Sequence, residues 1–231
     1  MLDEPVLDEK VGTWLDELAS AAPAPGGGAA AAMLAAVGAA LVSMVCNLTI
    51  GKPKYAEHEE TMVAALVSAT DLREAAVRLA AEDAVVFGAV SDAYKLPRGT
   101  EADKAARSEA IQVALVGAAG VPLRTAAVAA AVIGLAERIL EGSNVSVLSD
   151  VAVAASSARA ALDAAAVNVE INLAALKDPE SRAALRTELD RQLPAAQTAG
   201  QVVAAVRARI GGGQGGSGGQ GGSGGQGGLG V

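Results

Sequence analysis

Apolar residues recur at intervals of three and four along most of this chain, which is the spacing that places them on one face of an α-helix. Together with the breaks at Gly and Pro, the pattern predicts six helices, at about residues 6–20, 29–48, 57–94, 100–140, 147–176 and 178–210. The second helix is apolar nearly all round, which favours a central position. Long helices joined by short connections indicate an all-α fold, a single up-down helical bundle.

The predicted helices occupy residues 1–210, which we expect to form one domain. Residues 211–231 differ from the rest: they hold 14 of the 27 glycines in a charge-free QGGSGG repeat. Such a Gly/Gln/Ser-rich segment has no apolar side chains to offset the entropy lost on ordering. We therefore predict a disordered tail over 211–231.

The composition narrows the fold class further. Alanine accounts for about a quarter of the residues, and aromatic residues for only 2%. Ala favours helix, whereas β-sandwiches and barrels draw on β-branched and aromatic residues. Because small side chains bury little area per residue, and one helix is apolar on every side, we expect that helix to pack against a second subunit in a homodimer.

The charge and the rare residues exclude several function classes. A net charge of −8 disfavours nucleic-acid binding, which needs a basic face. One Cys excludes an internal disulfide, and one Cys with one His excludes the usual zinc sites. We expect no metal and no other cofactor. The first ten residues are acidic and lack the apolar core of a signal peptide, so a cytoplasmic protein is expected.

One stretch is long enough to span a bilayer. Residues 26–50 carry no charge over 25 positions. However, the stretch is mostly Ala and Gly, lacks flanking aromatic belts, and is not bounded by cations on both sides. We interpret it as a buried helix of a soluble protein and expect no membrane partner.

The most unusual motif is the glycine run before the second predicted helix. In PAPGGG, Pro25 is followed by Gly26, Gly27 and Gly28. Backbone N–H groups at such a helix start are unobstructed and can bind anionic or carbonyl oxygens. A helix breaker that permits close packing is the equally good alternative. The spacing matches neither a Walker loop nor a dinucleotide fingerprint.

Two further polar clusters border helix ends. Lys52 and Tyr55 lie just after the second helix, where a cation also complements the helix dipole. Asn144, Ser149 and Asp150 lie around the start of the fifth helix, where they can simply satisfy its free N–H groups. Both clusters are candidate substrate-binding groups with a purely structural alternative.

Asp83 is the candidate catalytic residue. It lies inside the third predicted helix and is followed by three apolar residues and the only Phe. A carboxyl group at the border of a buried stripe can have a raised pKa and act as a general acid or base, although most helical acids are only solvated. Asn168 and Asn172 share a helix face and either bind a polar ligand or join two helices.

Other rare residues are assigned structural roles. His58 is expected at the surface, Cys46 in the core, and Trp14 as a packing anchor. Neither His58 nor Cys46 has the sequence neighbours of a nucleophile with its base.

Several of these segments together resemble the cyclodeaminase/cyclohydrolase family, which includes the cyclodeaminase domain of formiminotransferase-cyclodeaminase and stand-alone methenyltetrahydrofolate cyclohydrolases. The resemblance covers about residues 14–205 and rests on the following segments, in order: PAPGGGAAA, MVCNLTIGKPKY, DAVVFGAVSDAYKLPRGTEADKAAR, VPL at 121–123, SNVSVLSD at 143–150 and NVEINL at 168–173. The chain departs from the family pattern at Ala29, Pro53 and Asn144.

The resemblance implies an all-helical homodimer that acts on one-carbon units attached to tetrahydrofolate. Asp83 matches the family's proton acceptor. The glycine motif and the segment ending in Lys52 and Tyr55 would line the folate site, and Ser149 and Asp150 match the family's Ser-Asp pair. Lys52 and Arg124 are, by charge alone, possible partners of the folate carboxylates.

The expected activity is therefore methenyltetrahydrofolate cyclohydrolase, which opens 5,10-methenyltetrahydrofolate to 10-formyltetrahydrofolate by acid–base catalysis. Formiminotetrahydrofolate cyclodeaminase, which releases ammonia, is the alternative. A non-catalytic helical adaptor is the third possibility.

Overall fold

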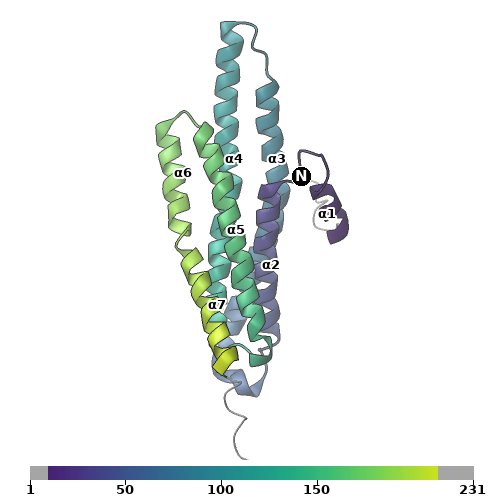
Figure 1. Ribbon diagram of the computed structural model, residues 1–231, viewed down its shortest axis with the longest axis vertical. Helices are drawn as coiled ribbons and strands as arrows, with labels where there is room; N and C mark the ends of the chain where they lie inside the picture. The colour runs from purple at the N-terminus through teal and green to yellow at the C-terminus, as the bar shows by residue number, and fades with distance from the viewer. Residues whose placement is uncertain (1–9, 213–231) are drawn as a thin grey trace, which may run out of the picture.

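The computed structural model describes residues 10–212, and every regular element in that range is helical (Figure 1). The α-helices are α1 Val11–Leu18, α2 Gly27–Asn47, α3 Glu59–Lys95, α4 Glu101–Ile139, α5 Leu148–Ala175, α6 Pro179–Gln192 and α7 Ala195–Gly212. Two short 3₁₀ helices, η1 Pro53–His58 and η2 Val145–Val147, join α2 to α3 and α4 to α5. The prediction of an all-α up-down bundle is confirmed.

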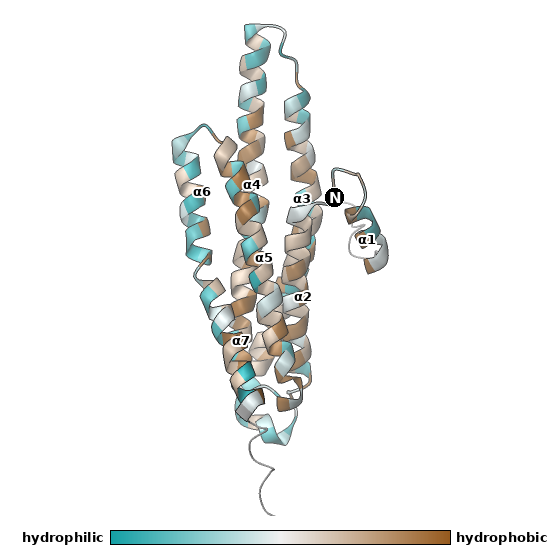
Figure 2. Cartoon of the chain, in the orientation of Figure 1, coloured by the Kyte–Doolittle hydropathy of each residue, from teal (hydrophilic) through white to brown (hydrophobic). Residues whose placement is uncertain are grey.

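Helices α2 to α5 form the centre of the bundle. They alternate in direction, so that α2 and α4 each pack against both α3 and α5 (Figure 1). Helices α6 and α7 cover one side of α4 and α5. Hydrophobic residues concentrate on the central helices, whereas α6 is mostly hydrophilic (Figure 2). The two long helices α3 and α4 continue beyond the top of α2 as a hairpin (Figure 1).

The core is built largely from alanine. Side chains without any exposed area at the α2–α5 contact include Ala35, Ala39, Ala154 and Ala158. A Cβ added at Gly38 would lie 3.0 Å from the Ala154 carbonyl oxygen, which shows how closely the two helix backbones approach. The small side chains of this alanine-rich chain therefore set the spacing of the helices.

A smaller apolar cluster lies near the N-terminal end of α2. It contains Ala29, Ala32 and Leu79, and the partly buried Trp14 of α1 packs against it. The prediction that Trp14 is a packing anchor is confirmed. This contact holds α1 beside the start of α2, where the glycine motif lies.

The prediction of one continuous sixth helix over about residues 178–210 is wrong. The helix is interrupted at Leu193 and Pro194, and α6 and α7 lie on either side. Proline has no N–H to donate, and its ring clashes with the carbonyl four residues earlier. Helix α7 continues to Gly212, two residues past the predicted domain end. The rest of the predicted tail, like residues 1–9, lies outside the described residues.

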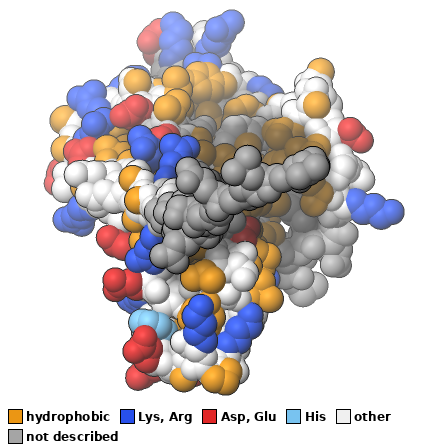
Figure 3. All heavy atoms as spheres, turned by 60° about the horizontal axis from the view of Figure 1, so that its bottom comes forward, with side chains coloured by type: hydrophobic (Ala, Val, Ile, Leu, Met, Phe, Trp, Pro, Cys, Tyr) orange, Lys and Arg blue, Asp and Glu red, His pale blue; other side chains and the backbone are white. Residues whose placement is uncertain are grey.

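Three of the helices are long and apolar enough to cross a membrane by length and composition: Gly27–Asn47, Glu101–Ile139 and the span Val145–Ala175. Within the bundle, 61% of the most apolar window is buried in each of the first two, and 39% in the third. Acidic and basic side chains are interspersed with hydrophobic ones on the face that Figure 3 shows.

Candidate active site

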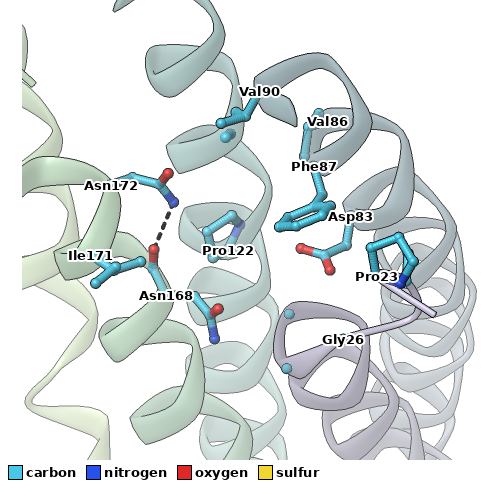
Figure 4. A pocket seen from close by; sticks show the side chains of 14 residues that line it. Pro23, Gly26, Asp83, Val86, Phe87, Val90, Pro122, Asn168, Ile171 and Asn172 are labelled. Atoms are coloured by element: carbon cyan, nitrogen blue, oxygen red, sulfur yellow. Dashed lines mark hydrogen bonds between the residues drawn. The ribbon is translucent and has the colours of Figure 1, made fainter. Parts of the chain in front are cut away.

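A cavity of about 450 Å³ lies where the N-terminal end of α2 meets α3, α4 and α5 (Figure 4). Its volume is in the range of small-molecule sites. The lining residues are Pro23, Ala24, Gly26, Gly27, Gly28, Asp83, Val86, Phe87, Val90, Ala118, Pro122, Asn168, Ile171 and Asn172. The cavity thus contains the glycine motif, Asp83 and the asparagine pair, three features that are far apart in the sequence.

The Asp83 carboxyl group is fixed at the N-terminus of α2. Its Oδ2 accepts a hydrogen bond of 3.0 Å from the Ala29 N–H, one of the N–H groups that the first helical turn leaves without an intrahelical partner. Burial raises the pKa of Asp83 above its ordinary value, and the Ala29 N–H partly opposes that rise. The direction of this shift agrees with what the apolar neighbours of Asp83 in the sequence led us to expect.

The Asp83 carboxyl group lies so close to the start of α2 that only glycine fits at position 28. A Cβ added at Gly28 would lie 2.0 Å from Asp83 Oδ1, which is impossible without displacing the carboxyl group. At the neighbouring Gly27, a Cβ would lie 3.9 Å from Asn168 Nδ2. The two glycines therefore lie between the acid on α3 and the amide on α5. The close packing that was the structural alternative for the glycine run therefore holds at Gly28, and its partner is Asp83.

The opposite wall comes from α4 and α5. Pro122 has no N–H, so the carbonyl of Ala118, four residues earlier, lacks its usual helical donor, and both residues line the cavity. Asn168 and Asn172 project from α5 across the cavity from Asp83 (Figure 4). Neither Pro122 nor Ala118 was predicted to bind a ligand; the available signal was a proline inside a predicted helix.

The cavity carries one charged side chain, that of Asp83, among its lining residues. Its remaining side chains are apolar or amide groups, with the Phe87 ring beside the acid (Figure 4). A carboxylate in such surroundings stabilises positive charge nearby, while two amides and free backbone N–H groups offer hydrogen bonds. The site thus fits a neutral or cationic heterocycle better than an anion.

The second group of predicted binding residues lies at the other end of α2. With 21 residues, α2 is roughly 30 Å long at 1.5 Å per residue, and it separates Gly27 from the region after Asn47. Within one chain, this distance keeps Lys52, Tyr55, Asn144, Ser149 and Asp150 out of the Asp83 cavity. The prediction that both groups line one site does not hold for a single copy of the chain.

At that far end, Asn144 and Tyr55 are structural. The buried Asn144 donates from Nδ2 to the Leu48 carbonyl at 3.0 Å, and its N–H donates to Thr49 Oγ1 at 3.1 Å. Its Oδ1 accepts from the Ser146 N–H and from the Tyr55 hydroxyl. These bonds tie the end of α2 to the α4–α5 connection. Lys52 and Ser149 are exposed.

Two further candidates lie near the cavity without lining it. Arg124 forms an ion pair with Glu82 and faces a separate surface groove with Arg78 and Val128. Pro25, joined to Ala24 by a cis peptide bond, precedes the lining glycines but does not line the cavity itself.

The remaining rare residues behave as expected or nearly so. Cys46 is fully buried, and burial raises the pKa of its thiol to about 11. His58 is half-buried: it contacts Glu57 at 3.3 Å, and its ring packs where a Cβ on Gly142 would be. Within residues 10–212, no three His, Cys, Asp or Glu side chains come together as a metal site would require.

Comparison with known proteins places these features in context. The sequence profile described as formiminotransferase-cyclodeaminase matches residues 10–191. A methenyltetrahydrofolate cyclohydrolase from Methylorubrum extorquens is 50% identical over 171 residues, which are 74% of this chain and 82% of that protein. A formimidoyltransferase-cyclodeaminase from Rattus norvegicus is 31% identical over 208 residues, or 90% of this chain but only 38% of the rat protein.

A solved structure agrees with the fold. The crystal structure of formiminotetrahydrofolate cyclodeaminase from Thermotoga maritima superposes with a TM-score of 0.79 and 29% sequence identity. The match covers 89% of this chain and 98% of that one.

Proposed function

Because the chain belongs to the formiminotransferase-cyclodeaminase family, we propose that it is an enzyme of folate one-carbon chemistry that acts at the Asp83 cavity. The activity that the site and the relatives support best is methenyltetrahydrofolate cyclohydrolase. One observation carries the proposal: a single, partly buried carboxylate, held by the Ala29 N–H, faces a cavity otherwise lined by apolar and amide groups.

The reaction needs little more than such a carboxylate. The 5,10-methenyl bridge is an amidinium-like cation, so its carbon is already electrophilic. Asp83 takes a proton from a water molecule as the water oxygen bonds to that carbon. Asp83 then returns the proton to N5 as the C–N5 bond breaks, the hydroxyl proton leaves to solvent, and the formyl group remains on N10. The same carboxylate stabilises the substrate's positive charge while it binds.

Two features of the site prepare Asp83 for this role. Burial raises its pKa, which makes the carboxylate a stronger base than an exposed one. The Ala29 N–H holds one oxygen, Oδ2, and so leaves Oδ1 for the water. This chemistry calls on residues of the chain alone, so we propose that no metal or other cofactor takes part.

Formiminotetrahydrofolate cyclodeaminase is the second candidate, favoured by the similarity to the Thermotoga maritima structure. In that reaction N10 attacks the formimino carbon, and ammonia leaves after protonation. One carboxylate can serve both reactions, since each needs a proton removed from the attacking atom and given to the leaving nitrogen. The higher identity to the cyclohydrolase, 50% against 31%, puts the cyclohydrolase first.

Two absorbance assays on one purified sample distinguish the candidates. The expected result is faster decay of the methenyl absorbance than in buffer alone, with 10-formyltetrahydrofolate as product. Formation of the methenyl absorbance together with ammonia from formiminotetrahydrofolate, without accelerated decay, would assign the chain to the alternative. Absence of both activities would contradict the proposed function and favour a non-catalytic adaptor.

We also propose a homodimer formed through the outer face of α2. This face presents Leu34, Val37, Leu41, Met44 and Leu48 at alternating intervals of three and four, and between 37% and 49% of each is exposed except for the half-buried Leu41. No charge interrupts residues 26–50. A stripe of this kind is self-complementary, as a twofold interface requires.

An antiparallel pairing of this stripe has a consequence for the site. If the twofold axis crosses α2 at Leu41, residue 34 of one copy faces residue 48 of the other. Because α2 ends at Asn47, Gly27 of one copy would then lie beyond the C-terminal end of α2 in the other copy, on the side where the chain continues through Lys52 into η1. The prediction that Lys52 contributes to the folate site then applies across the dimer.

We propose that the protein is cytoplasmic and water-soluble. The apolar windows of α2 and α4 are mostly buried against other helices of the same bundle. The negative net charge and the buried, unpaired Cys46 are also typical of such proteins.

A further inference from the structure

Two asparagines stand in an alanine-rich helix at the cavity wall. Helix α5 is built mainly from Ala and Val, and Asn is a poorer helix former than Ala because its amide competes for backbone hydrogen bonds. Asn168 and Asn172 lie four residues apart, so both face the cavity, and both are half-buried. Their presence there costs helix stability, which a role in binding would explain.

The orientation of each amide follows from its hydrogen bond. Asn168 Nδ2 donates to the Ala164 carbonyl at 2.8 Å. Asn172 Nδ2 donates to the Asn168 carbonyl, also at 2.8 Å (Figure 4). A carbonyl oxygen can only accept, so the NH₂ group of each amide must face it. Each Oδ1 and the second N–H of each NH₂ group therefore remain for another partner.

The hydrogen bonds of the described residues show no such partner on another helix. Both amides bond only to carbonyls of α5 itself, so they do not join α5 to α2, α3 or α4. Of the two alternatives that the sequence left open, the geometry supports a polar ligand. A ligand in the cavity would meet two hydrogen-bond acceptors and two donors on the α5 wall, with the Asp83 carboxylate across the cavity (Figure 4).

We propose that Asn168 and Asn172 bind the pteridine ring of the substrate through its 2-amino-4-oxo edge, and thereby orient the one-carbon bridge toward Asp83. This edge presents an N–H beside a carbonyl oxygen and an amino group, which complement the free Oδ1 and N–H of an asparagine. The proposal rests on the proposed function, because it deepens the chemistry of the same cavity.

The charges of the cavity decide which part of the substrate enters. The p-aminobenzoyl-glutamate tail is anionic, and the lining residues include a carboxylate and no cation. Burying the tail there would place like charges together without compensation. The pyrimidine part of the pteridine is neutral and flat, the one-carbon bridge beside it is cationic, and Phe87, Pro122 and Ile171 offer apolar contact for the faces of the ring. The ring therefore occupies the cavity, and the tail stays outside.

Fragment binding tests the proposal directly. The probes are 6-methyltetrahydropterin, which has the ring without the tail, and p-aminobenzoylglutamate, which has the tail without the ring. Calorimetric titration of the full chain is expected to show binding of the pterin. The variants Asn168→Leu and Asn172→Leu keep the branched heavy-atom shape of the side chain but replace the amide atoms with methyl groups, and each is expected to weaken pterin binding by about tenfold or more.

Controls separate binding from folding. Leu is a better helix former than Asn, so both variants should melt at or above the wild-type temperature by circular dichroism. Gln201→Leu removes an exposed amide from α7, away from the cavity, and should leave pterin affinity within about twofold of wild type.

The outcomes distinguish this inference from the proposed function. Pterin affinity within twofold of wild type in both Asn variants, or a wild type that binds the tail fragment and not the pterin, would overturn the inference. Turnover of methenyltetrahydrofolate by the wild-type protein, measured alongside, shows whether the proposed function stands on its own. If no turnover occurs, the function fails, and the inference that depends on it fails as well.

Discussion

The Asp83 carboxyl group experiences two opposing influences. Burial disfavours its charged form, and the Ala29 N–H favours it; burial dominates, so the pKa is raised from its ordinary value near 3.8. A base must be ionised to accept a proton. We therefore predict that kcat/KM falls as the pH drops through an apparent pKa above 3.8, measured as a pH–rate profile of methenyl decay.

The raised pKa of Asp83 also affects how the stability of the fold depends on pH. With a folded-state pKa above the unfolded one, ionised Asp83 destabilises the fold at neutral pH, and this cost disappears as the pH falls below the unfolded-state value. In the pH–rate profile, an acidic limb with an apparent pKa at or below 3.8 would contradict the assignment of a raised pKa to the catalytic base.

Gly28 offers a second test at single-residue scale. In Gly28→Ala, the new Cβ would overlap the Asp83 carboxyl group, so that group must move away from Ala29. We expect a loss of activity of about 100-fold or more and a stability loss of about 1–3 kcal/mol, measured by enzyme assay and urea unfolding.

Gly117→Ala is the matched control for that substitution. It lies inside α4 with open space around its Cβ position, and there the change from Gly to Ala should stabilise the helix by about 0.5–1 kcal/mol. Equal activity in both variants would show that the approach of Gly28 to Asp83 is unimportant.

At the scale of whole elements, most helix boundaries followed from local chemistry. Thr100 and Asp103 form a complete capping box at the start of α4, and Asp178 caps α6 before Pro179. The break at Pro194 was missed because the apolar spacing continues across it. Proline in that position acts through the backbone, which the side-chain pattern does not report.

The connection between α2 and α5 depends on Asn144. Its side chain and N–H make four hydrogen bonds that link Leu48, Thr49, Tyr55 and Ser146. We predict that Asn144→Ala lowers the free energy of unfolding by about 1–3 kcal/mol, because the three side-chain hydrogen bonds to Leu48, Tyr55 and Ser146 are lost while the N–H bond to Thr49 stays. Ser149→Ala, on the exposed start of α5, should change it by less than about 0.5 kcal/mol in the same urea titration.

A similar loss in both variants would show that Asn144 has no special structural role. The sequence could place Asn144 and Tyr55 near helix ends, but it could not show that they bond to each other. Residues 89 positions apart are brought together only by the packing of α2 against α5.

For the whole molecule, the sequence predicted the bundle but not the assembly of the cavity. Periodicity and alanine content are properties of single helices, and they were enough to predict the fold class. The meeting of Gly28, Asp83 and Asn168 depends on which helices are neighbours, which no local pattern states. The resemblance to a family put the glycine motif and Lys52 in one site, yet α2 separates them within one copy.

The proposed dimer is tested by its outer stripe. Val37 belongs to this outer face of α2 and has 49% of its area exposed. Val37→Glu places a charge in the proposed interface, and we expect it to convert dimer to monomer in sedimentation equilibrium. Val113→Glu, on α4 with 70% of its area exposed, is the control and should leave the mass unchanged. A wild-type protein that sediments as a monomer would contradict the proposal.

The role of Asp83 as the base is tested most directly by Asp83→Asn. Asparagine can still accept the Ala29 hydrogen bond through its Oδ1, so the fold should survive, but it cannot take a proton from water. The account predicts a fall in the rate of methenyl decay of about 100- to 10,000-fold, with an unchanged circular dichroism spectrum. Asp163→Asn, which removes an exposed carboxylate from α5, should retain nearly full activity. Full turnover by Asp83→Asn would contradict the account.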